Sequence, residues 1–222
     1  AETNVTEKQA ALETAEAAVT EKEEAVENAK TALEEKETAY QEAQDKLAEL
    51  DENYKQAVEA TRAAQEKVNS AQEAVNSAQS ALSSAQATLS STPSTIPETR
   101  TGTSADGTTY TYTVQVPNPA YAAAQQAVKE AEANLAEKEK ELQAAQEELQ
   151  KCKDAEQKAL DAVNTQKEEV AQAKQAVEDA QQQLEEAEQA LKTAEEELEK
   201  AQQEVEKAEQ ELQKAQEAVL SV

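Results

Sequence analysis

Residues 177–219 read VEDAQQQLEEAEQALKTAEEELEKAQQEVEKAEQELQKAQEAV. Every seventh residue of this stretch is Val or Leu, and the residues between are mostly Ala, Glu, Gln and Lys. A spacing of seven places the large side chains on one face of a helix, and over many repeats it imposes a left-handed supercoil on paired helices. The stretch therefore predicts a long helix within a coiled coil.

The same spacing of seven runs through almost the whole chain. One series of large residues extends from Val5 to Leu89 and a second from Tyr121 to Val219, and only Thr61 and Glu156 within them are not apolar. The position three residues after each large one is most often Ala. A large column facing an alanine column lets two helix backbones approach closely. The chain therefore predicts two long helices that pack on each other.

The two series are separated by the insert 92–118, TPSTIPETRTGTSADGTTYTYTVQVPN. Pro93 and Pro97 are expected to end the first helix, because proline cannot continue the helical hydrogen bonding. Asn118 followed by Pro119 is typical of a helix cap and first-turn residue. The insert is therefore expected to form a separate structure between the helices.

Period-two alternation marks a strand within the insert. From Thr108 to Val116, Thr and Gln alternate with Tyr and Val, the pattern of a half-buried strand. Asp106-Gly107 is a favoured turn pair, and the Thr-rich run from Thr99 to Thr103 precedes it. We predict a small β-hairpin, and because an isolated hairpin is marginal in water, we expect its Tyr and Val face to pack on the helix ends.

These observations predict an all-α fold, a long antiparallel two-helix coiled-coil hairpin with a small β-hairpin insert at the tip. The first helix is predicted over 1–91, the insert over 92–118 and the second helix over 119–222. The alternative is a parallel homodimer of extended chains, in which the insert would interrupt a longer rod. Because the chain begins at Ala1 without a Met and ends inside a running heptad, we interpret it as a piece of a longer protein.

Thr61 and Glu156 fall in one neighbourhood when the hairpin closes just beyond Leu89. Polar residues in a uniform apolar seam penalise slipped registers, so we interpret these two as register-setting core residues. The alternative is that Glu156 simply turns its carboxylate to solvent.

The composition argues against several classes of function. A net charge of -26 disfavours nucleic acid and anionic membranes, and no stretch has the length of apolar sequence needed for membrane insertion. His is absent and no phosphate loop or paired-cysteine motif occurs, so no catalytic, cofactor or metal site is expected. Asp106 has few acidic neighbours for a calcium site. Cys152 is expected to be a small core residue, with an intermolecular disulfide or reactive thiol as the alternative.

The insert is the exception to this featureless surface. It concentrates aromatic residues and Arg, the types that most often carry interface energy, and 68–91 beside it holds only one charged residue, Glu73. The alternative is that the tyrosines cap the coiled coil and the threonines form a solvated loop. The residues predicted to contact a partner are Arg100, Thr109, Tyr110, Thr111, Tyr112 and Thr113.

The repeats VNSAQEAVNSAQSALSSAQ at 68–86 and AEQALKTAEEELEKAQQEVEKAEQELQKAQ at 187–216 resemble alanine-rich coiled-coil stalks of Gram-positive cell-wall-anchored surface proteins, including adhesins. The resemblance covers both helical regions. It implies an extracellular, cell-wall-anchored spacer that projects a binding region, with a host or partner-cell protein or glycan as partner.

We therefore expect a non-enzymatic adhesin stalk or helical-hairpin binding domain that presents a ligand-binding tip from a bacterial surface, with self-association as a possibility. The rival is an intracellular coiled-coil scaffold or dimerisation arm that binds a partner protein along its shaft. A signal peptide and wall-sorting segment in the full-length gene would distinguish the first from the second.

Overall fold

The computed structural model describes residues 1–221. Two helices, α1 (Glu2–Ser91) and α2 (Pro119–Leu220), enclose in sequence two strands, β1 (Thr95–Thr103) and β2 (Thr109–Pro117). The chain divides into two compact units. Unit 1 holds Ala1–Asp51 with the part of α2 from Ala162 onward, and unit 2 holds Glu52–Asp161.

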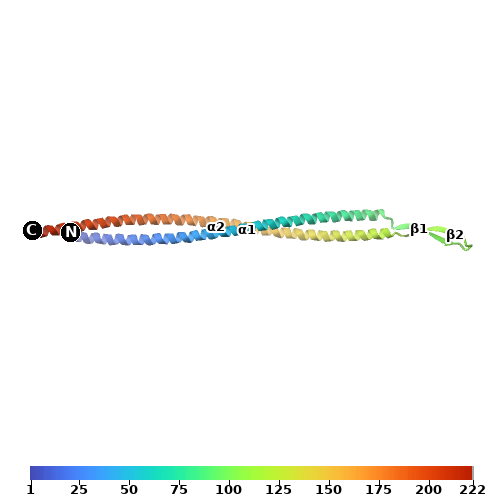
Figure 1. Cartoon of the computed structure of the whole chain (residues 1–222), viewed down its shortest axis with the longest axis horizontal. Coiled ribbons are helices and arrows are strands. Elements are labelled where there is room, and N and C mark those ends of the chain that lie inside the picture. Colours follow the sequence, from blue (N-terminus) through green and yellow to red (C-terminus); the bar gives the residue numbers. More distant parts are fainter. Residues whose placement is uncertain (222) are drawn as a thin grey trace. The chain divides into compact units, whose positions relative to one another are not determined.

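The helices pack on each other in antiparallel directions, which confirms the predicted helical hairpin over the parallel arrangement of extended chains. Within unit 1, the start of α1 lies beside the end of α2 (Figure 1). The Lys8 ammonium donates to Glu204 at 2.8 Å, and further along the unit the Gln166 side chain donates to the backbone oxygen of Ala43 at 3.0 Å.

Within unit 2, α1 and α2 are also paired in antiparallel directions. Thr61 of α1 and Glu156 of α2 line one surface hollow, and Leu82 of α1 and Leu135 of α2 line another. The β-hairpin leaves this unit from the ends of its two helices.

The core follows the predicted columns. Each large residue of the first series, and of the second as far as Leu212, is buried or half-buried, whereas Val219 is 77% exposed. The buried apolar residues come from both columns, and they are Val26, Ala64, Val75, Ala78, Ala124, Leu149, Val163, Ala180, Ala194, Val205 and Ala208.

Glutamine side chains reinforce the outer helix faces. In both helices a Gln amide donates to an acidic or amide side chain four residues later, as from Gln41 to Asp45 and from Gln175 to Asp179, each at 2.9 Å. Such pairs lie on neighbouring turns and each adds a few tenths of a kcal/mol to helix stability, on the order of 0.2–0.5 kcal/mol. These pairs stabilise helices whose core residues are mostly small.

Asn118 joins the helices to the hairpin. Its side-chain oxygen accepts from the Ala120 amide at 3.0 Å, so it caps α2 as predicted, and Pro119 is the first helical residue. Its side-chain amide donates to the Pro93 oxygen at 2.7 Å, and its backbone amide donates to the Ser94 oxygen at 2.9 Å. Asn118 thus holds the segment that follows α1 and the start of α2 together.

The predicted β-hairpin is present, and its first strand is longer than expected. β1 pairs antiparallel with β2 from Thr95 opposite Pro117 to Thr103 opposite Thr109. Pro97 lies inside β1 and does not end a helix, because α1 already stops at Ser91.

The turn between the strands has the predicted Asp106-Gly107 pair at its centre. The Asp106 carboxylate accepts from the Thr108 amide at 3.0 Å, and this hydrogen bond lowers the pKa of Asp106. The Gly107 amide donates to Ser104 at 2.9 Å, and Gly107 has φ +84°, a conformation that favours glycine.

The expectation that the Tyr and Val face packs on the helix ends is wrong for the tyrosines. Tyr110 is 51% exposed and Tyr112 is 42% exposed, while Val114 and Val116, nearer the helices, are half-buried. The nine-residue strands carry both tyrosines beyond the helix ends. The alternation of Thr with Tyr therefore does not mark a buried face.

Candidate functional site: the β ribbon

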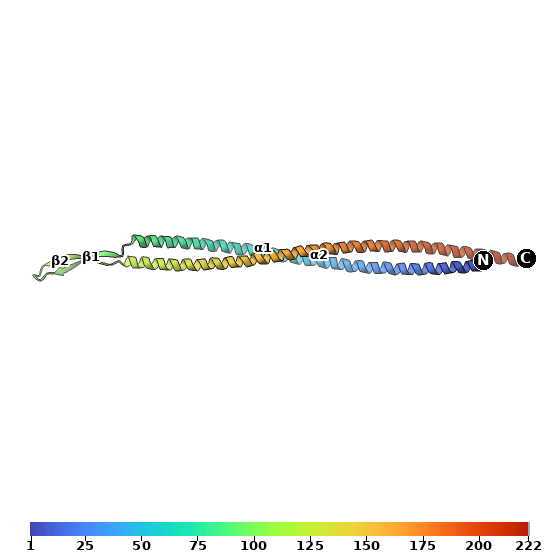
Figure 2. The same ribbon diagram turned by 180° about the vertical axis from the view of Figure 1, so that it is seen from behind.

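β1 and β2 form a two-stranded sheet that we name the β ribbon (Thr95–Thr103 with Thr109–Pro117). It extends away from the helix ends of unit 2, as views from opposite sides agree (Figures 1 and 2). Within the ribbon, only Gly102, Val114 and Val116 are half-buried and every other residue is exposed. Both faces are therefore open to a partner.

One face, the tyrosine face, carries the apolar side chains of the ribbon. Tyr110 and Tyr112 lie two residues apart on β2 with ring centroids 5.9 Å apart and planes tilted by 40°. The Tyr110 ring lies against Gly102, where an added Cβ would meet its Cζ at 2.8 Å. The glycine thus makes room for the aromatic ring across the strand pair, and Ile96 adds a further apolar side chain, 37% exposed, on the same face.

Arg100 also lies on the tyrosine face, opposite Tyr112 in the strand register. Its Nε donates to the Glu98 carboxylate at 2.9 Å, and both side chains are about half exposed, at 52% and 50%. Sequence reasoning missed Glu98, although residues two apart on a strand share a face. Arg100 therefore presents a paired charge.

The other face, the threonine face, is almost uniform. Three successive rungs pair threonine with threonine across the strands, and all six side chains are exposed. Opposite residues of such pairs lie about 4.5–5.5 Å apart, so the methyl and hydroxyl groups form a regular array. The rungs are Thr99 with Thr113, Thr101 with Thr111 and Thr103 with Thr109.

The residues predicted to contact a partner therefore divide between two faces. Arg100, Tyr110 and Tyr112 lie on the tyrosine face, and Thr109, Thr111 and Thr113 lie on the threonine face. A partner that lies flat on the ribbon meets one set or the other, and only a partner along the β2 edge reaches both.

Thr61 and Glu156 lie away from the ribbon within unit 2. They line one surface hollow together with Lys153, Gln157 and Leu160, and both are half-buried. The Thr61 hydroxyl donates to its own helix, to the Ala57 oxygen at 3.0 Å. The register-setting role of the two residues stays a prediction.

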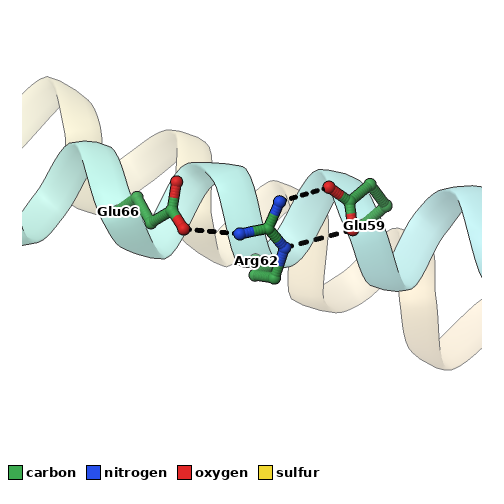
Figure 3. A network of polar contacts seen from close by, with 3 residues as sticks. All are labelled: Glu59, Arg62 and Glu66. Atoms are coloured by element: carbon green, nitrogen blue, oxygen red, sulfur yellow. Dashed lines mark hydrogen bonds and ion pairs between the residues drawn. The ribbon is translucent and has the colours of Figure 1, made fainter.

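Arg62, next to Thr61, faces outward and bridges two acids of its own helix (Figure 3). Its Nε donates to Glu59 at 3.1 Å, and its two terminal nitrogens pair with Glu59 and Glu66. The hydrogen bonds from Arg62 lower the pKa of Glu59. Because these side chains are 60–64% exposed, water screens the pairs and we treat them as helix support and not as a site.

The end of the helices in unit 1 offers a second, apolar surface. A hollow there is lined by Ala1, Thr3, Leu212 and Val219, among others. Leu220, which also lines it, is 87% exposed.

Residues 1–221 contain neither a metal-ligand cluster nor a membrane-spanning helix. No group of three or more His, Cys, Asp or Glu residues is placed to hold a metal ion in this range, and no helix in it is long and apolar enough to cross a bilayer. Cys152 is half-buried.

Comparison of the chain with protein-family models, with curated proteins and with solved structures gives no match.

Proposed function

We propose that the chain is a non-enzymatic stalk domain of an extracellular, cell-wall-anchored bacterial adhesin, in which the β ribbon binds a host or partner-cell protein or glycan. The single observation that carries this proposal is the exposure of Tyr110 and Tyr112 on a ribbon that extends past the helix ends. Half-exposed tyrosines cost free energy in water and are enriched where interfaces form.

Charge favours the ribbon over the helical surfaces as the place of contact. The ribbon and its turn contain two acids, Glu98 and Asp106, and one base, Arg100, whereas the whole chain carries 47 acids and 21 bases. Bacterial walls and host-cell surfaces are anionic, so a strongly acidic helical surface is repelled while the nearly neutral ribbon is not. The alanine-rich repeats supply the spacer in this account.

The test is binding of the purified chain to arrays of glycans and extracellular-matrix proteins, beside a variant in which 94–115 is replaced by a short Gly-Asn loop. The proposal predicts binding that is lost in the variant. A matched control replaces Thr6, Thr14 and Thr20, exposed on α1, with Ser and should bind like the parent. Equal binding by the parent and the loop variant would refute the proposal.

A second candidate function is an intracellular scaffold or dimerisation arm that pairs with a partner helix. The exposure of Val219, at 77%, favours it, because Val219 continues the apolar column of α2 after Leu212 and stands open beside Leu220, which is 87% exposed. The experiment is capture of helical partners by the chain beside Val219→Gln with Leu220→Gln. Loss of capture would favour the scaffold, and unchanged capture would exclude this end as the docking face.

A further inference from the structure

The β ribbon is an unusual structure to leave uncovered. Two antiparallel strands alone are at best marginally stable in water, and three or more strands with an apolar face are needed for independent stability. The ribbon has only two strands, and the tyrosine end of its apolar face receives no cover from the helices. A further strand would supply what the ribbon lacks.

Hydrogen bonds at both ends of the ribbon reveal which backbone groups face outward. The Ser104 amide donates to Thr108 at 2.8 Å, and the Asn118 amide donates to Ser94 at 2.9 Å. Hydrogen-bonded pairs alternate with non-hydrogen-bonded pairs along an antiparallel ladder. Counting inward from either end gives the same result: the residues of β2 whose amides and carbonyls point away from β1 are Thr109, Thr111, Thr113 and Gln115.

The two edges of the ribbon are not equally open. On the β1 edge, Pro97 removes one outward amide, and Glu98 and Arg100 place charges along the strand. Proline and charge are the usual means by which proteins protect a sheet edge from further pairing. β2 reads TYTYTVQVP, with no charged residue and no proline before Pro117. The β2 edge is therefore open.

We propose that a second copy of this chain pairs with the β2 edge, strand against antiparallel strand, to form a four-stranded sheet in the order β1-β2-β2-β1. With Tyr112 on the two-fold axis, Thr111 of one copy lies opposite Thr113 of the other, and Thr109 lies opposite Gln115. All four outward residues of each copy then find partners. Such a contact is isologous and closes at two copies.

The side chains of β2 suit pairing with themselves. In this register Tyr110 meets Val114 of the second copy and Tyr112 meets Tyr112, so the two tyrosine faces join into one apolar surface. Aromatic and β-branched cross-strand pairs are among the more favourable ones. No like charges meet, because β2 has none.

Charge explains why a second copy would pair here and not along the helices. Each chain carries a net charge of -26, whereas the ribbon and its turn contain two acids and one base, a net of -1. Repulsion between charges fades beyond about 8 Å at physiological salt, so contact through the ribbon keeps most acidic residues outside that range. This inference needs only the ribbon edge and does not rest on the proposed adhesive function.

The first test is sedimentation analysis of the whole chain over a concentration series, beside Thr111→Pro and Thr101→Pro. The Thr111 and Thr101 amides both point outward, so proline at either position spares the ribbon's own ladder, as Pro97 does in β1. We expect the parent and Thr101→Pro to dimerise and Thr111→Pro to remain monomeric. A parent that stays monomeric at the highest concentration reached, or equal dimerisation of both variants, overturns the proposal.

A second test does not depend on proline. In a Cys152→Ala background, Tyr112→Cys should form a disulfide-linked dimer under mild oxidation, because the axis brings two copies of residue 112 opposite each other. Arg100→Cys, on the same rung but on the β1 strand, is the matched control and should stay monomeric. Equal cross-linking of the two variants, or none by Tyr112→Cys, overturns the proposed edge.

Discussion

The Nε2 amide of Gln166 on α2 donates to the backbone oxygen of Ala43 on α1 at 3.0 Å, and Gln166 is only 2% exposed. Gln166 occupies the column that holds Ala159 one heptad before and Ala173 one heptad after. On α1, the residues one heptad from Ala43 are Lys36 and Leu50, both larger. The buried amide therefore disfavours a shift of unit 1 by one heptad in either direction, because the residue that would then face it is larger than Ala43.

Replacing Gln166 with Leu should separate stability from register. The Ala43 oxygen keeps its helical partner, so an apolar side chain of similar size should raise the free energy of unfolding by about 1 kcal/mol. Slipped registers should then become populated, as when buried polar residues are removed from other coiled coils.

The measurement for Gln166→Leu is thermal unfolding together with distances between spin labels at positions 14 and 193, in a Cys152→Ala background. We expect a higher melting temperature and a broadened distance distribution. Gln175→Leu is the control, since Gln175 is exposed on the same helix. A distribution as narrow as that of the parent would remove the register role of Gln166.

Thr61 and Glu156 should behave similarly in unit 2. Changing both to Leu completes the apolar columns. Because the sites are half-buried, each Leu should raise the free energy of unfolding by about 1 kcal/mol, which is part of the full transfer free energy of a Leu side chain. Melting should shift upward and label distances across unit 2 should broaden. Thr38→Leu, at an exposed site, should change neither. If the double variant melts like the parent, the two residues are not core residues.

Gly102 is predicted to set the position of the Tyr110 ring. Gly102→Ala places a Cβ 2.8 Å from the Tyr110 Cζ and 3.0 Å from the Tyr110 Oη, which is closer than these atoms can approach, so the ring must move. The ring tip can move into solvent, and the lost chain entropy of Gly offsets part of the strain, so the stability should change by less than about 1 kcal/mol. NMR shifts of the Tyr110 ring should change in Gly102→Ala and not in Thr101→Ala. Unchanged Tyr110 shifts would contradict the contact.

The ion pair between Lys8 and Glu204 should make a small, pH-dependent contribution to the stability of the fold. The hydrogen bond from Lys8 lowers the pKa of Glu204, and the bond to Glu204 raises the pKa of Lys8. Since the pKa of Glu204 is depressed, its contribution is present above the ordinary Glu value and is lost as pH falls through the lowered one. Since the pKa of Lys8 is raised, its contribution is present below the ordinary Lys value and is lost as pH rises through the raised one.

Thermal melts of Glu204→Gln and of the parent check this sign. The variant should melt slightly below the parent at neutral pH, and the difference should vanish in strong acid, where Glu204 is protonated. Both side chains are substantially exposed, so water limits the size of the difference. Glu206→Gln is the control, because Glu206 has no basic partner among residues 1–221. A difference that persists in acid would show that the carboxylate charge is not its source.

The sequence predicts the long-range pattern of this molecule better than its local contacts. The spacing of seven identifies the helix faces because burial of a column depends on periodicity and not on the identity of any one partner. Asn118 and Asp106-Gly107 are also predictable, because caps and turns are local. The polar partners of Gln166 and Arg100 are not predictable in this way. The partner of Gln166 depends on how two separate helices align, and the partner of Arg100 depends on the side-chain conformations of two strand neighbours. The exposure of Tyr110 was missed since alternation does not reveal how far a ribbon extends beyond its support.

The most direct test of the account is adhesion of beads coated with the whole chain to surfaces bearing fibronectin, collagen or mucin glycans. Beads coated with the variant in which a Gly-Asn loop replaces 94–115 serve for comparison, at equal coating density. The account predicts that the parent beads adhere to at least one surface and that the variant beads do not. Adhesion of both to the same extent would contradict it, because the helices and not the β ribbon would then hold the partner.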